Sequence, residues 1–363
     1  MNKIDFARIR DFLNKDIGPS KISPRIMTLF LKQLSLLLNS GLSLDKALMI
    51  IRGQKLDKKL TKSLEGVLYQ LDQGYSAYEA FRKEEKVFGP MLIAFIKSGD
   101  ESGKLSDILE EYSRYVDFDS KNKNQIKQAL IYPIILLLVT IFVVAIIMTV
   151  VMPTFVYTFE GYGVDLPITT RILIRISEAF RDYWLVFLLV ILLALLGFLF
   201  LYRIASFRFR IDTLIFKYMP FKKLMILSME YQISSLLYIL RSGDINLIEC
   251  MDIIKAAFKN TYLKIQFDYI KEDLTRGISL SESFDMRGIF SKLLVSMVEV
   301  GEQSSNLVES LDKASDYYAN EYIYRLVGVS RLAEPIMILI MALIVGFVVF
   351  SVAIPMFDSI NYI

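Results

Sequence analysis

The residues from Gly99 to Lys104 read Gly-Asp-Glu-Ser-Gly-Lys, a combination of glycines and a lysine that could bind phosphate. A nucleotide-binding P-loop needs four residues between its glycines and a serine or threonine after its lysine, because these groups hold the phosphates and a magnesium ion. Here three residues separate Gly99 from Gly103, and Leu105 follows the lysine. A second copy, which starts at Gly301, has no lysine. We therefore expect a tight turn between two helices, with its acidic residues near a helix N-terminus.

Acidic side chains in the two turns could bind a divalent cation or a basic surface of a partner. Asp100 and Glu101 lie in the first turn, and Glu302 lies in the second. A solvated cluster that caps a helix is the alternative interpretation. The candidate partner-contact residues are those of the two turns and the acidic residue and proline that open the last apolar run: Gly99, Asp100, Glu101, Gly103, Lys104, Gly301, Glu302, Glu334 and Pro335.

The chain has no histidine and a single cysteine, Cys250. The lack of histidine excludes Ser-His and Cys-His catalysis, histidine general bases and histidine-containing metal sites. Cys250 lies in an apolar helical stretch, where we expect a packed, unreactive thiol, and it can form no disulfide within the chain. We therefore predict no catalytic residue, no cofactor and no resident metal.

Apolar residues make up 54% of the 363 residues and charged residues 22%, a mixture that indicates soluble domains joined to a few membrane spans. The net charge of +3 is too small to attract nucleic acid, so we expect no nucleic-acid partner. The N-terminal fifteen residues are charged throughout, which argues against a signal peptide.

Three segments contain no charged residue, namely 128–159, 183–202 and 335–357. Each includes about 20 apolar residues, the length of a helix that crosses a bilayer. Lysine and arginine concentrate on one side of these segments, which by the positive-inside rule is the cytoplasmic side. We expect a multi-pass protein of the inner membrane with a cytoplasmic N-terminus and an extracytoplasmic C-terminus. Glu334 then lies at the entrance of the last span, where an interfacial anchor and a polar contact with another helix are both open.

Two soluble segments show the apolar spacing of helices and almost no strand signals. We predict an all-α membrane protein with two homologous cytoplasmic helical-bundle domains, module 1 and module 2, of about six short helices each, plus three transmembrane helices. The predicted divisions are an N-terminal cytoplasmic segment (1–23), module 1 (24–128), transmembrane helix 1 (129–153), an extracytoplasmic loop (154–183), transmembrane helix 2 (184–203), a linker (204–227), module 2 (228–331), transmembrane helix 3 (332–357) and an extracytoplasmic tail (358–363).

The modules repeat each other at a nearly constant offset, which indicates a duplication. The prolines that bound the first and third spans are 202 residues apart in each case, 335 − 133 and 355 − 153. The Ser-Gly pair at 40–41 is aligned with the pair at 242–243, where a helix should stop, and a one-residue insertion follows. At the resulting offset of 203, two Ser-x-x-Glu sequences that start at Ser76 and Ser279 predict two capping boxes.

Together these features resemble the platform (F-type) proteins of type II secretion systems and type IV pilus assembly machines, over residues 24 to 357. That family has a duplicated cytoplasmic helical domain, with spans after the first copy, before the second and after the second. Two departures are Asp100, where the family usually has glutamate, and Ser305, which replaces the second glycine of the later turn. The residues that carry the resemblance are Ser40-Gly41 with Leu44, Ala47 and Leu48, the turns at Gly99 and Gly301, Leu166-Pro167 with Thr170, and Glu334-Pro335 with Val345, Gly346 and Phe347.

The resemblance implies a non-enzymatic assembly core in the cytoplasmic membrane. Its partners would be a hexameric cytoplasmic ATPase that contacts the modules, pilins or pseudopilins that contact the spans, other inner-membrane assembly proteins and further copies of itself in a homo-oligomer. ATP-driven motion of the motor would then be transmitted to pilin assembly. Type IV pilus, competence pilus and type II secretion system all stay open.

Two other classes of protein are weighed against this one. A transporter or permease subunit needs polar residues along its spans, and these are nearly lacking. A membrane-anchored signalling enzyme needs a nucleotide site, which the turn at Gly99 does not provide. The copies differ at Lys104 against Asn306 and at Tyr132 against Glu334, and there we expect to find what faces the motor and what faces the pilin.

Overall fold

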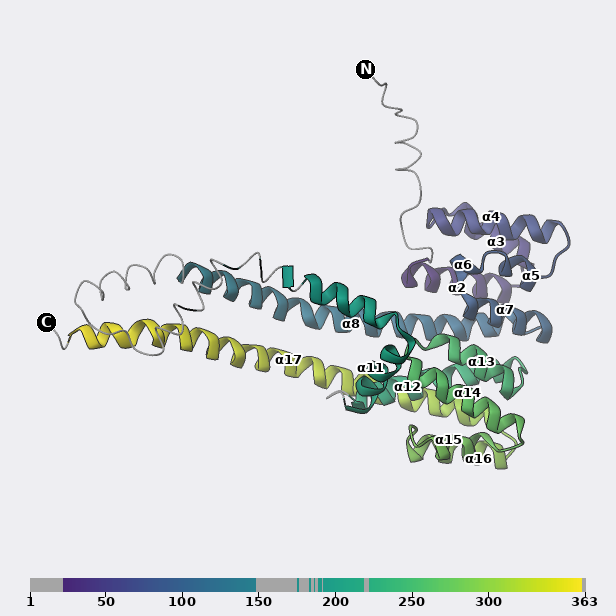
Figure 1. Ribbon diagram of the computed structural model, residues 1–363. Coiled ribbons are helices and arrows are strands. Elements are labelled where there is room, and N and C mark those ends of the chain that lie inside the picture. The colour runs from purple at the N-terminus through teal and green to yellow at the C-terminus, as the bar shows by residue number, and fades with distance from the viewer. Residues whose placement is uncertain are drawn as a thin grey trace, which may run out of the picture. The chain divides into compact units, whose positions relative to one another are not determined.

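The computed structural model describes residues 22–147, 192–218 and 222–360, together with positions 175, 183, 186, 189 and 190. Every regular element in these ranges is a helix, which confirms the predicted all-α class (Figure 1). Four parts of the prediction lie wholly or mostly outside the described residues: the N-terminal segment, the end of the first span, the outer loop with Leu166-Pro167, and the beginning of the second span.

The chain divides into two compact units. Unit 1 consists of Met1–Lys121 and Ser228–Tyr318, so both modules pack together in it. Unit 2 consists of Asn122–Leu227 and Ala319–Ile363, which include the predicted spans. The duplication therefore gives one compact body with two halves.

Module 1 consists of short helices whose starts are fixed by local hydrogen bonds. The hydroxyl of Ser23 accepts from the amide of Ile26, and the carboxylate of Asp57 accepts from two amides of the helix that follows it. Each cap of this kind contributes about 1 kcal/mol. The helices are α2 (Pro24–Asn39), α3 (Leu44–Gly53), α4 (Lys58–Asp72), α5 (Ala77–Arg82), α6 (Glu85–Phe88), α7 (Pro90–Ser102) and the first turns of α8 (Leu105–Ile146).

Module 2 repeats this order. The side chains of Asn246, Asn260 and Ser291 each accept from the amide three residues on, and so fix three helix starts. In the described chain between Leu280 and Gln303, no helix corresponds to α6. The helices are α12 (Lys222–Ser242), α13 (Leu247–Ala257), α14 (Thr261–Thr275), α15 (Leu280–Arg287), α16 (Lys292–Gln303) and the first turns of α17 (Leu307–Ile360).

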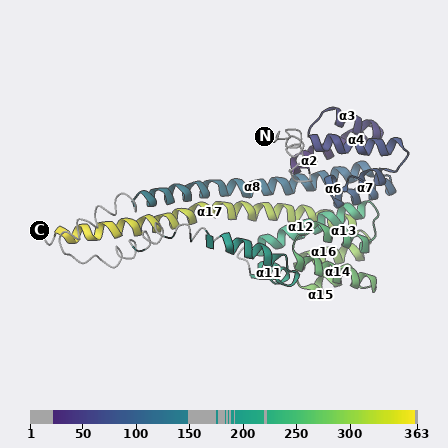
Figure 2. The same cartoon turned by 45° about the horizontal axis from the view of Figure 1, so that its top comes forward.

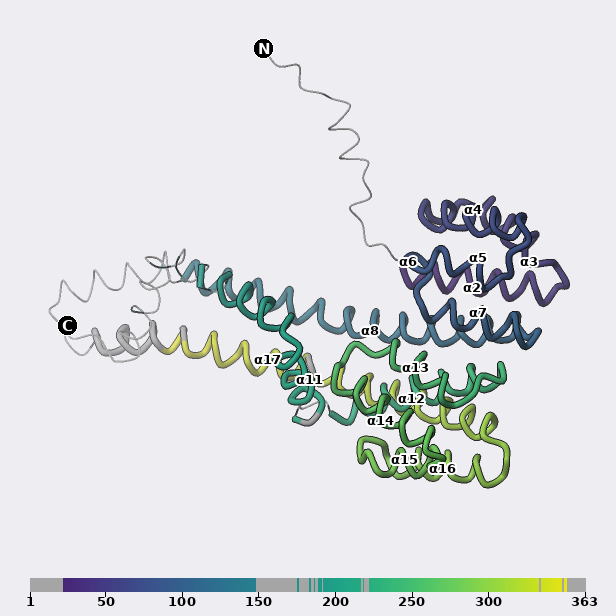
Figure 3. The backbone as a smooth tube through the Cα atoms, turned by 45° about the vertical axis from the view of Figure 1, so that its right-hand side comes forward, coloured from purple at the N-terminus to yellow at the C-terminus, as the bar shows by residue number. Residues whose placement is uncertain are grey.

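Each module has an aromatic core of its own. In module 1 the ring of Phe88 lies 5.7 Å from Phe30 and 5.0 Å from Phe81. In module 2 the rings of Phe284 and Phe290 stack at 4.1 Å. Burying one such side chain contributes about 1.5–3 kcal/mol. Within unit 1, α4 lies at one end of the helix stack, α7 and α13 meet in the middle, and α15 and α16 lie at the other end (Figures 1 and 3).

The helices α2 and α12 end in the same way, one residue out of the predicted alignment. The amide of Leu42 donates to the carbonyl of Leu37, and the amide of Ile245 donates to that of Leu240, an offset of 203. The left-handed residue in these turns is residue 41 (φ 84°) or residue 244 (φ 62°). The predicted pairing of Ser40-Gly41 with Ser242-Gly243 is therefore wrong by one residue. It followed residue type, whereas this turn needs a left-handed residue at a fixed place, which an aspartate can supply.

The helices α8 and α17 run without a break from the modules into the apolar segments (Figure 2). They contain 42 and 54 residues and pass straight through the predicted boundaries at 128/129 and 331/332. Pro133 and Pro335 lie inside them. Each proline removes one helical hydrogen bond, yet both helices continue.

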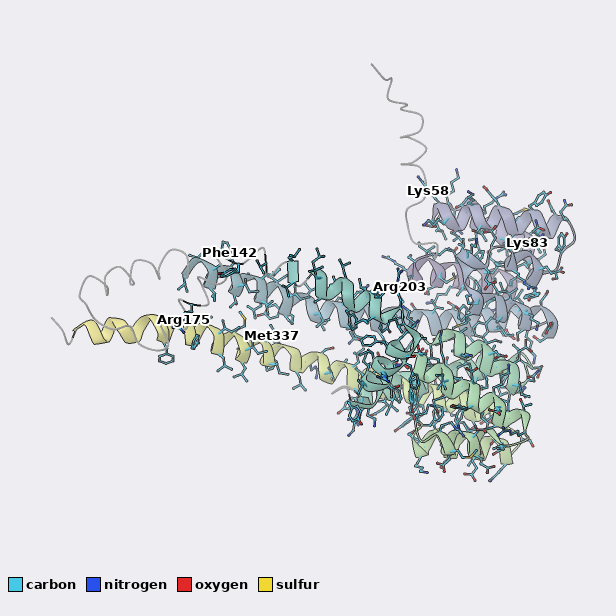
Figure 4. The ribbon with its side chains drawn as sticks, in the orientation of Figure 1. Lys58, Lys83, Phe142, Arg175, Arg203 and Met337 are labelled. Atoms are coloured by element: carbon cyan, nitrogen blue, oxygen red, sulfur yellow. The ribbon has the colours of Figure 1, made fainter. Side chains whose placement is uncertain are left out.

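Within the described residues, two helices are long and apolar enough to cross a membrane, Leu105–Ile146 and Leu307–Phe347. Phe142 on α8 and Met337 on α17 mark these apolar parts in Figure 4. The described end of the second predicted span, Leu192–Tyr202, bends by 101° into α11 (Ala205–Tyr218). The predicted linker 204–227 is thus mostly helical, and the hydroxyl of Tyr202 donates to Asp212 across the bend at 3.0 Å.

Candidate functional site

A turn separates two helices at each predicted place, but it is shorter than predicted, because residues 99–102 belong to the end of α7 and residues 301–303 to the end of α16. The helices on either side of each turn meet at very close range. A Cβ built on Gly99 would lie 2.6 Å from the Cα of Leu105, the first residue of α8. A Cβ built on Gly301 would lie 2.8 Å from the Cβ of Ser310. No side chain fits at either place without moving a helix, so these glycines set how α7 meets α8 and how α16 meets α17.

The residue that ends each turn is left-handed. Gly103 has φ 70°, and its counterpart Ser305 has φ 54°. The amide of Asn306 closes the second turn by donating to the carbonyl of Gly301 at 2.9 Å. Serine thus keeps the backbone conformation of the missing glycine, at a cost of about 1–2 kcal/mol.

The acidic residues of the turns cap a helix, but not the one that follows them. The carboxylate of Glu302 accepts from the amides of Leu280 and Ser281 at 2.8 and 3.1 Å, at the start of α15. Asp100 accepts from the amide of Tyr78 at 3.5 Å, at the equivalent place in α5. A carboxylate there is favoured by the exposed amides of the first turn. Glu101 is exposed and lies 4.0 Å from the ammonium of Lys97.

One of the two predicted capping boxes is complete. The hydroxyl of Ser76 accepts from the amide of Glu79, whose carboxylate accepts from the amide of Ser76. In α15 the hydroxyl of Ser279 accepts from the amide of Glu282 at 3.2 Å. The described side chains of that helix show no return bond, and Glu302 occupies the exposed amides beside it. Among the described residues no group of three His, Cys, Asp or Glu side chains is placed to hold a metal ion.

Lys104 binds module 2. Its ammonium donates to the carbonyl of Ser242 at 3.1 Å and to the carboxylate of Asp244 at 3.4 Å. Ser242 is the last residue of α12, where a cation is favoured by the exposed carbonyls. The counterpart, Asn306, instead donates to Glu309 within its own helix. Lys104 therefore makes a contact between the modules, whereas Asn306 at the equivalent position makes only a local one.

Two residues at the centre of this contact were not identified from the sequence. The hydroxyl of Ser98 donates to the carbonyl of Gly243 at 3.2 Å, and both residues are buried. A Cβ on Gly243 would lie 1.9 Å from Oγ of Ser98 and 2.8 Å from a methyl of Ile108. Gly243 is thus required by packing between modules and not by its own turn.

An ion pair lies beside this close contact. The ammonium of Lys97 on α7 is 2.8 Å from the carboxylate of Glu249 on α13. The hydrogen bond to Glu249 is the main cause of a raised pKa at Lys97. Because both side chains are partly exposed, the pair contributes modestly to stability and more to the choice of partner surface.

Aromatic rings extend the contact along α8 and α12. The ring of Tyr231 lies 6.1 Å from Tyr115 and 4.0 Å from Phe118. The hydroxyl of Tyr115 donates to Gln232 at 3.5 Å. We name the two surfaces that meet here the carboxyl-terminal face of module 1 (Lys97, Ser98, Lys104, Tyr115) and the amino-terminal face of module 2 (Tyr231, Ile239, Gly243, Glu249).

Glu334 lies at a groove of unit 2. The groove encloses about 430 Å³ between α8 and α17 and is lined by Tyr132, Pro133, Arg331 and Glu334, among others. Proline has no amide hydrogen, so Pro133 and Pro335 leave the carbonyls four residues before them without a helical donor. Two of the residues that differ between the copies, Tyr132 and Glu334, thus line the same groove.

Cys250 is packed inside module 2, as the sequence predicts. It is fully buried and its thiol donates to the carbonyl of Ile245 at 3.7 Å. Burial raises the pKa of Cys250 to about 12, so the reactive thiolate is disfavoured.

Two copies of a helical module, each leading into a long apolar helix, define a duplicated all-helical membrane protein. The chain belongs to the family described as type II secretion system (T2SS), protein F, whose sequence model matches residues 30–153 and 233–355. The two matches start 203 residues apart (233 − 30) and end 202 apart (355 − 153). These values agree with the offset of 203 at the ends of α2 and α12 and with the offset of 202 between the prolines.

Relatives of this chain are known from both kinds of machine. The type IV pilus assembly protein PilC of Pseudomonas aeruginosa is 26% identical over 347 residues, which cover 94% of this chain and 92% of the relative. PilC of Thermus thermophilus is 27% identical, over 92% of this chain and 82% of the relative. The type II secretion system protein F of Aeromonas hydrophila is 27% identical, over 93% and 87%.

Proposed function

We propose that this chain is the inner-membrane platform of a type IV pilus, a competence pilus or a type II secretion machine. In this role it couples a cytoplasmic ATPase to the assembly of pilins or pseudopilins and performs no chemistry itself. Membership of the protein F family and the names of the relatives support the class of machine.

The observation that carries the proposal is the continuity of α8 and α17. Each is a single helix from its module into an apolar segment. A helix without a flexible joint transmits a displacement of one end to the other, whereas a loop absorbs it. A force applied to unit 1 by a motor would therefore reach the spans directly.

We place unit 1 in the cytoplasm because of the charges that flank the spans. Lys121, Lys123 and Lys127 lie on α8 just before its apolar part, and Arg325 and Arg331 lie on α17 just before the other. Loops rich in lysine and arginine stay on the cytoplasmic side. A cysteine at Lys123 should be labelled by a maleimide only after the inner membrane is made permeable. Labelling in intact spheroplasts would show that residue 123 lies outside the cytoplasm and would contradict this orientation.

The candidate residues take two roles in this proposal. Gly99, Asp100, Gly103, Lys104, Gly301 and Glu302 act by holding the modules in shape, while Glu101 remains exposed for a partner of unit 1. Glu334 lies at the groove of unit 2, where we place the contact with a pilin or pseudopilin, and Pro335 follows it in α17. The Glu334→Gln variant should reduce assembly while leaving the level of the protein in the membrane unchanged.

A deletion strain tests the function. Without the gene, surface filaments or secretion of the substrate should be lost, and the wild-type gene should restore them. Affinity-tagged protein should recover the ATPase of that machine from membrane extracts. Assembly that continues in the deletion strain would contradict the proposal.

A further inference from the structure

The contact between the modules is heterologous, since it joins the carboxyl-terminal face of module 1 to the amino-terminal face of module 2. Two different surfaces meet, so each module uses only one of its two faces within the chain. Because the modules are copies of each other, each also has the face that the other uses. Module 1 has an amino-terminal face at the end of α2 and the start of α3, and module 2 has a carboxyl-terminal face at the end of α16 and the start of α17. We call these two the recurring faces.

Apolar side chains on the recurring faces are exposed where their counterparts are buried. Leu36 is 69% exposed, and its counterpart Ile239 is 1% exposed. Val300 is 61% exposed against 1% for Ser98. Tyr317 is 47% exposed against 8% for Tyr115. Apolar surface that clusters in this way on a soluble unit marks an interaction site.

Charges on the recurring faces are complementary with the sign reversed. The counterpart of Lys97 is Glu299, at the offset of 202 that also relates Gly99 to Gly301, and the counterpart of Glu249 is Lys46, at the offset of 203 that holds between the Ser-Gly pairs and the Ser-x-x-Glu sequences. Both Glu299 and Lys46 are exposed, and Glu299 accepts a hydrogen bond from Gln303 one turn on. A contact built like the one within the chain would therefore pair Glu299 with Lys46 and form an ion pair again.

The reversed signs also exclude the wrong pairings. The carboxyl-terminal face of module 1 on the amino-terminal face of another module 1 would bring Lys97 to Lys46. The equivalent pairing of two modules 2 would bring Glu299 to Glu249. Like charges at a contact disfavour it, so each face selects the other kind of module. This pattern fits alternation of module 1 and module 2.

We propose that the carboxyl-terminal face of module 2 binds the amino-terminal face of module 1 in a second copy of this chain. The contact repeats the one within the chain, with Glu299 beside Lys46 and Val300 beside Ser40. Where the two modules come closest, the side chains differ in size between the two contacts. Ser40 replaces Gly243 and Val300 replaces Ser98, both larger, whereas Ser310 replaces Ile108 and is smaller. The side chains at this point of the second contact are therefore packed differently. A heterologous contact of this kind produces a closed ring or an open array. The inference requires neither motor nor pilin, so its test is independent of the proposed function.

Disulfide cross-linking of the full-length chain in membranes tests the contact. A Cβ at position 243 would lie 3.2 Å from the Cβ of Ser98, close to the 3.5–4.5 Å of a disulfide, so the equivalent pair is Ser40→Cys with Val300→Cys. Two differently tagged copies, one with each substitution, are expressed together and oxidised. We expect a disulfide that joins the two tags.

Each variant expressed alone should give no cross-linked dimer, because the contact joins different faces. Dimers formed through Ser40→Cys alone or Val300→Cys alone would show a symmetric contact and overturn the proposal, as would the absence of the mixed dimer. The buried Cys250 stays in place and is controlled for by the wild-type chain. As a negative control, a Tyr69→Cys copy is expressed together with the Val300→Cys copy and should form no mixed dimer. Tyr69 lies exposed on α4, and its counterpart Glu272 is exposed outside the contact between the modules.

Charge reversal tests the selectivity of the same contact. Lys46→Glu and Glu299→Lys should each lower the yield of the mixed dimer about three- to fivefold, and the two together should restore it. Glu65→Lys on α4 and Lys83→Glu after α5 (Figure 4) lie off both faces and should change nothing. Single reversals without effect, or a double reversal that does not restore the yield, would overturn the pairing of Glu299 with Lys46.

Discussion

Ser305 and Gly103 occupy the same place before a long helix and hold the same left-handed conformation, but serine does so at a cost. We predict that Ser305→Gly stabilises unit 1 by about 1 kcal/mol and raises its melting temperature by about 2–4 °C. Thermal unfolding of the full chain in detergent, followed by circular dichroism, measures this. The reverse change, Gly103→Ser, should lower the melting temperature. A shift of both variants in the same direction would contradict the assignment.

Glu230 on α12 is a buried carboxylate that packs against the start of α16. It accepts from the amide of Ser291 at 2.5 Å, and the hydroxyl of Ser291 shares a hydrogen bond of 2.7 Å with Tyr318. Burial is the largest cause of a pKa raised above the ordinary value of 4.5. A raised folded pKa means that this group's contribution to stability is fully present below about pH 4.5 and is lost as pH rises through the folded pKa.

Replacing that carboxylate by an amide should remove this pH dependence. The Glu230→Gln side chain keeps an oxygen for the amide of Ser291 but carries no charge. We expect the melting temperature of the variant to exceed that of the wild type near pH 7 and the difference to shrink as pH falls toward 4.5. Melting curves of both proteins between these pH values are the measurement. Parallel curves would show that Glu230 does not titrate in this range.

At the scale of elements, the close contact of α7 with the turn between α12 and α13 depends on one missing side chain. Gly243→Ala would place a methyl 1.9 Å from Oγ of Ser98, so the modules must separate or shift. We expect a loss of about 1–3 kcal/mol, measured as a lower melting temperature of the full chain. Ser98→Ala in the same chain should recover part of it.

Gly53 at the end of α3 is the matched control for this prediction. A Cβ there meets nothing within 4 Å, and the residue is helical. Gly53→Ala should therefore be neutral or stabilise the chain by up to about 1 kcal/mol. Equal losses from Gly243→Ala and Gly53→Ala would show that packing between the modules does not explain the loss at Gly243.

Sequence patterns predict the helices because the signals for them are local. Ser76-x-x-Glu79 forms the capping box that its spacing predicts, and a turn at Gly103 and Lys104 separates two helices, although Gly99 lies inside the first of them. The same reasoning placed Asp100 and Glu302 at a helix N-terminus. It did not identify which helix, because the amides that they bind belong to residues about 20 positions earlier in the chain.

The contact between modules is the part that local patterns could not supply. Gly243 was aligned by residue type with Gly41, although its requirement comes from Ser98, 145 residues away. Lys97 and Glu249 are unremarkable alone among many charged residues. A signal did exist in the repeat, since the charges at 97 and 249 are reversed at 299 and 46, which are their counterparts at offsets of 202 and 203. The repeat alone does not show that residues 97 and 249 meet.

At the scale of the whole molecule, two modules feed two continuous helices into the apolar segments. The proposed function depends on this continuity, because a platform has to pass the movement of a motor to the subunits that it assembles. The glycine turns and the contact between modules contribute by keeping unit 1 rigid. A flexible joint between module and span should then abolish assembly without preventing folding or membrane insertion.

Asn124 lies on the exposed side of α8 between module 1 and the apolar part of the helix. Asn124→Pro removes a helical hydrogen bond and breaks or kinks the helix at a cost of about 3 kcal/mol, whereas Asn124→Ala preserves it. The most direct test is the number of filaments, or the amount of secreted substrate, in a deletion strain that carries either variant. We predict wild-type assembly with Asn124→Ala and a loss of about tenfold or more with Asn124→Pro, at equal membrane levels and equal recovery of the ATPase. Wild-type assembly with Asn124→Pro would contradict transmission of movement through α8.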